Sequence, residues 1–215
     1  MVKVKICGNR NRQDIRKTER ADAVGFIVET PESRRNLSTG EAARLVAKTR
    51  LFTDTVIVTT EVDPESLKRI TSEVQPDYIQ LHSELTFDRI KEISSTLAGS
   101  VGLISLLSVD DSRECPEKRA RKLTDLSLKG LLLDSKVEGR SGGTGQAHDW
   151  KISRKIRDTV HPFPVILAGG LNPGNVGEAI KTVRPYGVDV ATGVESDGEK
   201  SALKVGRFLK EVGKK

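Results

Sequence analysis

The first residue whose type and place could do chemistry is Cys7, which ends a short apolar run, Val2–Cys7. If this run is a strand, alternation puts Lys5 and Cys7 on one face, with Val4 and Ile6 on the other. A nearby lysine favours the thiolate, which is the form of cysteine that accepts a proton. A buried cysteine can equally be an inert small apolar side chain, so both interpretations stay open.

A carboxylate, Asp134, ends another apolar run, Gly130–Asp134. It could simply accept hydrogen bonds from loop amides. It could also exchange protons with a substrate if the fold sets it across a cavity from Cys7. The stretch Gly142–Gly145 that follows is rich in glycine and is either a mobile lid or a flexible turn.

Two glycine turns predict an anion site. Gly169 and Gly170 follow one apolar run, and Thr192 and Gly193 follow the next. Glycine lets backbone N–H groups approach an anion closely, and a short helix would add its positive N-terminal end. Glycine also marks any tight turn, but two such turns after the last two strands of a barrel favour phosphate.

Inward-facing polar residues are expected on two further runs. Alternation turns Asp189 inward, where it either pairs with Lys5 or contacts a substrate. Gln80 and His82 share the inward face of the run that contains them. His82 is either a hydrogen-bonded rim histidine or a group with a direct chemical role.

Adjacent arginines, Arg34 and Arg35, lie in the segment that follows the run Ala23–Val28. An arginine in such a loop can be merely solvated. It is also the side chain best suited to grip a substrate carboxylate with two parallel hydrogen bonds.

The elements that must position these residues recur at regular intervals. With eight apolar, β-branched runs in 215 residues, one unit takes about 27 residues, as in a (β/α)8 barrel. Helical segments between the runs imply parallel strands, and the competing doubly wound open sheet lacks its glycine fingerprint after the first run. The expected strands are Val2–Cys7, Ala23–Val28, Thr55–Thr60, Tyr78–His82, Val101–Leu106, Gly130–Asp134, Pro164–Ala168 and Gly187–Ala191.

Helix-start signals support the alternation of strands and helices. Ser38 and Glu41 form a capping box, and Asp63-Pro64 is an N-cap followed by proline at the first helical position. The segments expected to be helical after such signals are Ala42–Lys48, Leu67–Val74, Gly174–Val183 and a final helix near Ser201–Val212. We see no linker, so residues 1–215 are expected to form one catalytic domain.

Composition limits the class of protein. The chain carries 36 Lys and Arg against 30 Asp and Glu, a net charge of +6, and 36% hydrophobic residues. This balance excludes disordered and fibrous chains. No apolar run approaches the roughly 18 residues that span a bilayer, so no membrane segment is expected. Because the N-terminus lacks the apolar stretch of a signal peptide, we expect a cytoplasmic protein.

Nucleic-acid and metal binding are also disfavoured. The densest basic cluster, Lys118–Lys122, lies beside Glu114 and Glu117 and is expected to be a solvated helix face. Only 4% of the residues are aromatic, too few for base-stacking platforms. Cys7 and Cys115 form no CxxC pair and no Cys/His cluster has metal-ligand spacing, so both are expected to be free thiols.

Taken in chain order, these motifs resemble the phosphoribosylanthranilate isomerase family of tryptophan biosynthesis. The resemblance runs from the first strand to the last. The motifs are Lys5-Ile6-Cys7-Gly8, Ser33-Arg34-Arg35, Gln80-Leu81-His82, Leu133-Asp134, Gly142-Gly143-Thr144-Gly145 with Asp149-Trp150, Leu167-Ala168-Gly169-Gly170-Leu171-Asn172-Pro173, and Gly187-Val188-Asp189-Val190 with Gly193-Val194-Glu195.

The resemblance implies a barrel enzyme that needs no cofactor or metal. It implies that Cys7 is the general base, Asp134 the general acid, and Asp189 a residue near the sugar. Arg35 matches the residue that receives the anthranilate carboxylate, but Arg34 replaces a proline, so the choice between them stays open. The implied substrate is a small phosphosugar-anthranilate, rearranged by internal proton transfers. The protein is expected to be a monomer or a homodimer.

Two other functions are weighed against this one. A sister barrel isomerase of histidine biosynthesis would be expected to have aspartate at position 7 and two phosphate sites. A phosphosugar-binding barrel without activity would bind the substrate and give no time course. The sequence also departs from the family at Ala191-Thr192, where a Ser-Ser pair is usual, and at Asn9, where an apolar residue is usual. These changes are expected to alter the affinity for the substrate more than the proton transfers, because neither removes a catalytic group.

Overall fold

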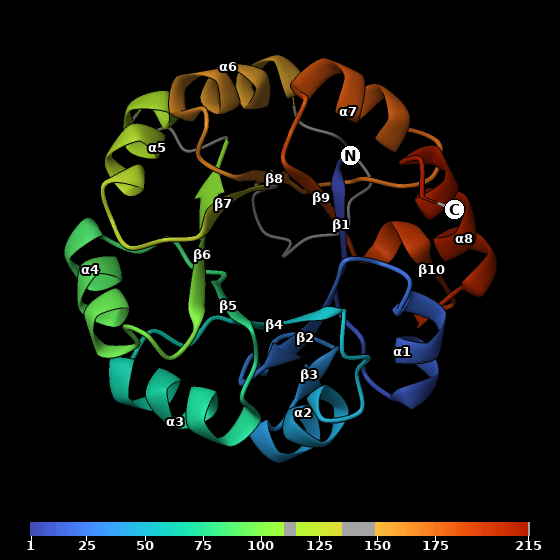
Figure 1. The fold of residues 1–215 in the computed structure, drawn as a ribbon, viewed down its shortest axis with the longest axis horizontal. Helices are drawn as coiled ribbons and strands as arrows, with labels where there is room; N and C mark the ends of the chain where they lie inside the picture. The colour runs from blue at the N-terminus through green and yellow to red at the C-terminus, as the bar shows by residue number, and fades with distance from the viewer. Residues whose placement is uncertain (110–114, 135–148, 215) are drawn as a thin grey trace.

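The computed structural model describes residues 1–109, 115–134 and 149–214, and its strands form a closed parallel barrel. Neighbouring strands follow chain order around the barrel, and β1 pairs with both β2 and β9, which closes it (Figure 1). The predicted (β/α)8 barrel is confirmed, and the open doubly wound sheet is excluded. The barrel strands are β1 (Lys3–Ile6), β2 (Ala23–Val28), β4 (Asp54–Thr59), β5 (Tyr78–Leu81), β6 (Gly102–Ser108), β7 (Gly130–Asp134), β8 (Val165–Leu167) and β9 (Gly187–Val190).

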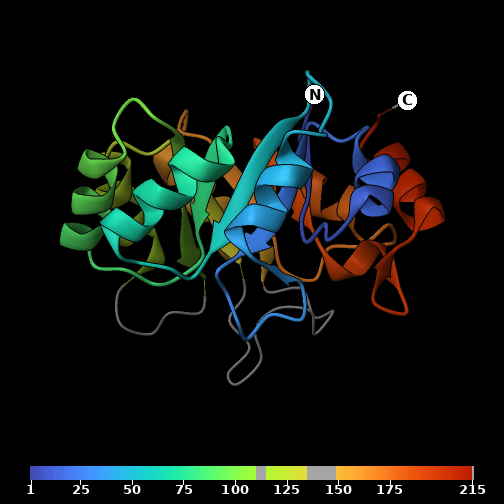
Figure 2. The ribbon, with the colours of Figure 1, turned by 90° about the horizontal axis from the view of Figure 1, so that it is seen from below.

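Helices form an outer ring around the strands (Figure 1). The two chain termini lie at the amino end of the barrel (Figure 2). The helices are α1 (Arg12–Thr18), α2 (Thr39–Val46), α3 (Pro64–Val74), α4 (Phe87–Thr96), α5 (Pro116–Thr124), α6 (Trp150–Val160), α7 (Val176–Val183) and α8 (Ala202–Glu211). Small elements not anticipated from the sequence are β3 (Asn36–Leu37), the 3-10 turn η1 (Thr192–Val194) and the hairpin of β10 (Glu195–Ser196) and β11 (Glu199–Lys200).

The predicted helix starts are largely confirmed. The capping box of Ser38 and Glu41 is present at α2, and Asp63 accepts a hydrogen bond from the Ser66 amide at the start of α3. The helix expected from Gly174 instead begins at Val176 as α7. The delay has a local cause. Asn172 Oδ1 accepts from the Gly174 amide (2.8 Å), and Asn175 Oδ1 accepts from the Asn172 amide (2.8 Å). These bonds stabilise a turn in competition with helix.

Two apolar layers follow from the period-2 alternation of the strands. The outward face packs under the helices; Phe26, Ile79 and Leu131, for example, belong to the same cluster as Leu67 of α3. Inside the barrel, Cys7 packs with Val56 and Val58 in a separate cluster. The predicted orientation of the first strand is therefore confirmed.

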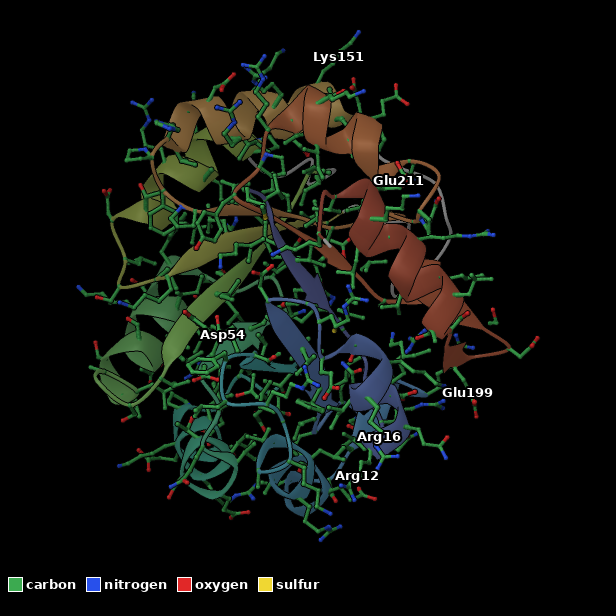
Figure 3. All side chains as sticks on the ribbon, turned by 45° about the vertical axis from the view of Figure 1, so that its right-hand side comes forward. Arg12, Arg16, Asp54, Lys151, Glu199 and Glu211 are labelled. Carbon is green, nitrogen blue, oxygen red and sulfur yellow. The ribbon has the colours of Figure 1, made fainter. Side chains whose placement is uncertain are left out.

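Charged side chains cover the outside of the ring. Arg12 and Arg16 on α1, Lys151 on α6 and Glu211 on α8 are exposed at the periphery (Figure 3). The basic cluster in α5 is likewise amphipathic, with Ala120 and Leu123 buried under its charged face. No helix in the described part of the chain is long and apolar enough to cross a membrane.

Candidate active site

A buried ion pair joins the strands that close the barrel. Lys5 on β1 is in register with Asp189 on β9, and its Nζ lies 3.0 Å from both Oδ1 and Oδ2 of Asp189. Lys5 is 4% exposed and Asp189 is 9% exposed. Burial lowers the pKa of Lys5, but the Asp189 carboxylate and Cys7 together outweigh burial, so the pKa is raised. Alternation left two interpretations of Asp189 open, and of these the pairing with Lys5 is present.

Cys7 lies one residue beyond β1, next to this pair. Its backbone N–H donates to the Val190 carbonyl (2.8 Å), which extends the β1–β9 ladder to the end of the barrel. Gly25 on β2 leaves the space beside it open. A Cβ there would lie 3.0 Å from Cys7 Sγ and 3.2 Å from Lys5 Cε. A glycine at this place therefore allows the thiol and the ammonium group to sit side by side.

The ionisation of Cys7 is decided by burial. Burial raises the pKa of the thiol, while Lys5 lowers it and Asp189 raises it again, with a net increase. Lys5 acts in the direction expected from the sequence. Burial acts against this effect of the cation, because it penalises the charged form of the thiol, and the net pKa of Cys7 is raised. Cys7 and Cys115 are both free, and Cys115 is exposed at the N-cap of α5.

Gln80 lies on β5, and His82 follows one residue beyond the end of that strand. Gln80 is 1% exposed, and its Nε2 lies 3.2 Å from His82 Nδ1. Burial lowers the pKa of His82, and the Lys5 cation lowers it further. His82 is therefore a neutral imidazole near the charge pair, which makes it a hydrogen-bonding group more than a cation.

Asp134 is the last residue of β7, half-buried and in register with Ser108 on β6. The strand end places its carboxyl at the same end of the barrel as Cys7. The glycine stretch predicted as a lid or turn, Gly142–Gly145, lies outside the described residues.

The turns after β8 and β9 are in direct contact. Gly169 and Gly170 have φ values of 85° and 65°, which glycine adopts without strain. A Cβ on Gly193 would lie 1.9 Å from the Leu171 carbonyl oxygen, so only glycine permits this approach of the two loops. Thr192 starts η1, which is three residues long and too short to supply the helix end that the sequence suggested. Backbone N–H groups are what these turns offer to an anion.

Arg35 and Arg34 occupy different environments. Arg35 Nε and Nη2 donate to the two carboxylate oxygens of Glu195 at 2.8 Å and 2.7 Å. The side chain of Arg35 is 12% exposed, whereas that of Arg34 is 62% exposed and reaches Glu195 at 3.3 Å. Of the two arginines left open by the sequence, Arg35 is the one fixed in the wall of the site.

Sequence reasoning missed the partners of Arg35. Glu195 stood in a family motif without a role, and Lys200 was not considered. Lys200 Nζ donates to Glu195 Oε1 (2.9 Å) and to the Ala191 carbonyl (3.1 Å), with its side chain 1% exposed. Nothing in its polar sequence neighbourhood indicates burial.

No metal cluster is present among residues 1–109, 115–134 and 149–214, where no three His, Cys, Asp or Glu side chains are grouped to hold an ion. Cys7 and Asp134 are groups that can exchange protons, and the surrounding charged side chains and backbone N–H groups are donors that can bind an anion.

Comparison with known proteins gives a consistent result. A family model described as N-(5'-phosphoribosyl)anthranilate (PRA) isomerase matches residues 4–211. An N-(5'-phosphoribosyl)anthranilate isomerase from Methanosarcina acetivorans is 40% identical, over 98% of this chain and 93% of that protein. The crystal structure of phosphoribosyl anthranilate isomerase from Thermotoga maritima is 34% identical, with a TM-score of 0.85 and 99% of each chain covered.

A more distant barrel shows how far the fold alone extends. A mutant tryptophan synthase α-subunit from Pyrococcus furiosus has a TM-score of 0.73 but only 14% identity, so it shares the fold and carries no information on activity. The family match and the relatives above cover nearly the whole chain. This chain therefore belongs to the N-(5'-phosphoribosyl)anthranilate isomerase family.

Proposed function

We propose that this chain converts N-(5'-phosphoribosyl)anthranilate to 1-(2-carboxyphenylamino)-1-deoxyribulose 5-phosphate, an Amadori rearrangement in tryptophan biosynthesis. The observation that carries the proposal is the buried Cys7 thiol beside the Lys5–Asp189 pair, at the carboxyl end of a barrel of this family. A solved relative is described as a complex with the reduced form of that product. The rearrangement consists of internal proton transfers, so it requires an acid and a base but no redox centre.

Asp134 is the proposed acid. Opening of the ribose ring requires a proton on the ring oxygen, and a carboxyl group at a strand end can deliver it. The open form is a Schiff base, whose iminium group makes the proton on sugar C2 acidic. That proton goes to the proposed base, and the resulting enolamine becomes the ketose product.

Cys7 is the proposed base, and its burial has two opposing effects. The raised pKa makes thiolate scarce at neutral pH. The same shift makes each thiolate a stronger base. Because the iminium group makes the C2 proton acidic, the Cys7 thiolate is a strong enough base to remove that proton. We propose that Asp189 and the neutral His82, with Gln80 behind it, contact the sugar.

The two ends of the substrate need separate anchors. Arg35 is proposed to receive the anthranilate carboxylate, and the backbone of Gly169, Gly170, Thr192 and Gly193 the phosphate. Anchors at both ends hold the reacting carbon between acid and base, which lowers the entropic part of the barrier. We propose that no cofactor or metal takes part, and that the enzyme works in the cytoplasm without a nucleic-acid partner.

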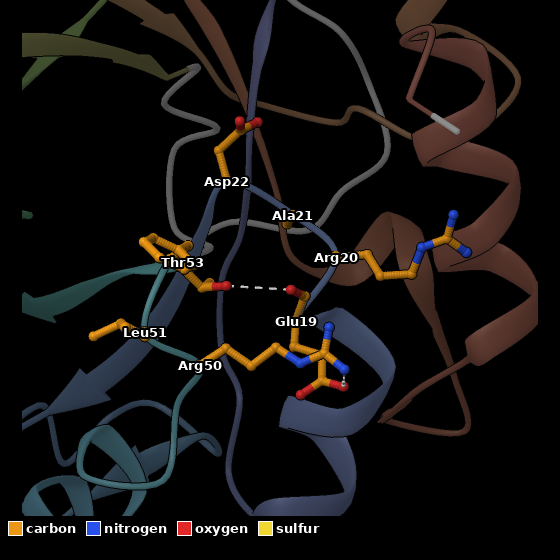
Figure 4. Close-up of a pocket in the computed structure, with 8 residues that line it drawn as sticks. Glu19, Arg20, Ala21, Asp22, Arg50, Leu51 and Thr53 are labelled. Carbon is orange, nitrogen blue, oxygen red and sulfur yellow. Dashed lines mark hydrogen bonds and ion pairs between the residues drawn. The ribbon is translucent and has the colours of Figure 1, made fainter.

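The amino end of the barrel supports a homodimer over a monomer. Leu51 and Phe52 in the α2–β4 loop are 88% and 93% exposed, and Tyr186 at the same end is 55% exposed. The loop is fixed against the α1–β2 connection by Arg50–Glu19 (3.1 Å) and Thr53–Glu19 (3.2 Å) contacts (Figure 4). Such exposed apolar groups indicate an interface. A Thermotoga maritima relative is described as dimeric, and we propose a second copy as the occupant.

The first prediction concerns turnover. The wild-type protein is expected to rearrange freshly made phosphoribosylanthranilate, followed by the change in anthranilate fluorescence, with no loss of rate in a metal chelator. Cys7→Ser should lose about 10²–10⁴-fold in kcat because the alcohol is a much weaker base. Asp134→Asn should lose turnover while ligand binding is kept, because an amide delivers no proton.

Cys115→Ser is the matched control and should stay within about twofold of wild type, because Cys115 is exposed at the N-cap of α5 and is not among the residues proposed for the site. Full activity in Cys7→Ser or Asp134→Asn would remove that residue from the mechanism. Binding without turnover by the wild-type protein would favour the inactive phosphosugar-binding barrel.

The second prediction concerns the phosphate turns. Gly193→Ala should weaken binding of ribulose 5-phosphate by at least about tenfold, since the added methyl group forces the two loops apart. Gly206→Ala is the control, because a Cβ there has open space. Titration calorimetry measures both. Equal affinity in the two variants would place the phosphate elsewhere.

The third prediction concerns the exposed loop. Sedimentation velocity at micromolar concentration should give the mass of a dimer for the wild-type protein. Replacing both Leu51 and Phe52 by serine should shift it to monomer, since the buried apolar area is lost. Leu203→Ser, which alters a 65% exposed leucine on α8, should leave the dimer intact. A monomeric wild-type protein would contradict the proposal.

A further inference from the structure

We propose that Glu195 is a positioning residue that orients Arg35 toward the substrate carboxylate. In this role Glu195 sets the preference of the site for an anthranilate-bearing ligand over a bare pentose phosphate. This inference rests on the function proposed above and assigns a role to a motif residue that the acid–base chemistry leaves unused. Glu195 itself need not touch the substrate.

The carboxylate of Glu195 is saturated with cationic donors. Oε1 accepts from Arg35 Nε (2.8 Å) and Lys200 Nζ (2.9 Å), and Oε2 accepts from Arg35 Nη2 (2.7 Å) and Arg34 Nη2 (3.3 Å). The two short bonds to Arg35 are parallel, the geometry that fixes a guanidinium plane most firmly. The side chain of Glu195 is 5% exposed, so water competes weakly for these bonds.

Glu195 is anionic in this setting. Burial would raise its pKa, but the hydrogen bonds from Arg35 and Lys200 outweigh burial and lower it. Lys200 donates to the same Oε1 that accepts from Arg35 Nε, and it also donates to the Ala191 carbonyl (3.1 Å). Ala191 immediately precedes the phosphate turn at Thr192. The same lysine therefore connects the support of Arg35 to the loop proposed to bind phosphate.

The stem of Arg35 is fixed by a different contact. It lies over Gly8, where φ is 78° and an added Cβ would be 2.5 Å from Arg35 Cδ. Arg35 is therefore constrained at its stem by the turn that follows Cys7 and at its head by Glu195. Burial also brings it within electrostatic reach of Cys7, which helps raise the pKa of Arg35 after the larger contribution of its hydrogen bond to Glu195.

The constrained guanidinium keeps one edge for a ligand. Nε and Nη2 are used by Glu195, and in the described part of the chain Nη1 donates no hydrogen bond. A free arginine side chain must lose rotamer freedom when it grips a ligand, and a preorganised one has already lost it. The resulting gain in affinity applies to a ligand that has a carboxylate at this end, and not to a pentose phosphate, which lacks one.

The opposite role would be competition. If Glu195 instead occupied Arg35 until the substrate displaced it, removing its charge would free Arg35 and tighten binding. Burial of Glu195 and its three other cationic and backbone attachments argue against displacement, since Lys204 Nζ also donates to its backbone carbonyl (2.6 Å). The two roles therefore predict opposite changes in product affinity when the charge of Glu195 is removed: weaker binding for positioning and tighter binding for competition.

The test compares Glu195→Gln with Glu199→Gln, an exposed glutamate on the same hairpin. Glu195→Gln is expected to raise KM for phosphoribosylanthranilate and the Kd of the product about tenfold. The kcat should stay within about threefold of the wild-type value, and the Kd of ribulose 5-phosphate within about twofold. Glu199→Gln should leave all four values unchanged. Tighter product binding, or equal loss for both ligands, would overturn the proposal.

A double-mutant cycle separates positioning from a purely structural role. In an Arg35→Ala background, Glu195→Gln should cause no further loss of product affinity, because its effect acts through Arg35. Additive losses would overturn the proposal even if Glu195→Gln lowers the stability of the fold. Product binding needs no turnover, so this arm remains decisive if the wild-type protein fails to catalyse the reaction, an outcome that would defeat the proposed function alone.

Discussion

The buried ion pair between Lys5 and Asp189 is the interaction on which the rest of the site depends. It joins the first and last barrel strands, and each partner is nearly inaccessible to water. Removing one partner would leave a buried charge uncompensated, which costs about 3–5 kcal/mol. The surroundings of the pair are close-packed: a side chain at Gly25 would crowd Lys5 and Cys7, and the Lys5 cation helps keep His82 neutral.

Cys7 lies between this pair and a second charge network. Lys5 and Lys200 both lower the pKa of Cys7, but burial raises it more than they lower it. Lys200 belongs to the Glu195 network that fixes Arg35, and Arg35 is itself within electrostatic reach of Cys7. The cations around Cys7 are already paired with buried carboxylates: Lys5 with Asp189, and Lys200 with Glu195. That arrangement suits proton exchange in a dry site, where electrostatic interactions are strong.

Local patterns in the sequence predict the strands, the capping box of α2 and the inward orientation of Lys5, Cys7 and Asp189, because alternation is a property of neighbouring residues. The bond between Arg35 and Glu195 joins residues 160 positions apart and has no local signal. The need for glycine at position 25 likewise comes from side chains on another strand. The raised pKa of Cys7 could not be predicted, because desolvation depends on the complete packing around the thiol.

Direct titration of Cys7 tests most sharply whether burial outweighs the neighbouring cation. In a Cys115→Ser background, ultraviolet absorbance of the thiolate reports Cys7 alone. The midpoint is expected above the usual thiol value of about 8.5, higher again in Lys5→Gln, and lower in Asp189→Asn, following the signs of their charges. Because the thiolate is the proposed base, the rate should rise with pH through the same midpoint. A Cys7 already ionised at neutral pH would contradict this.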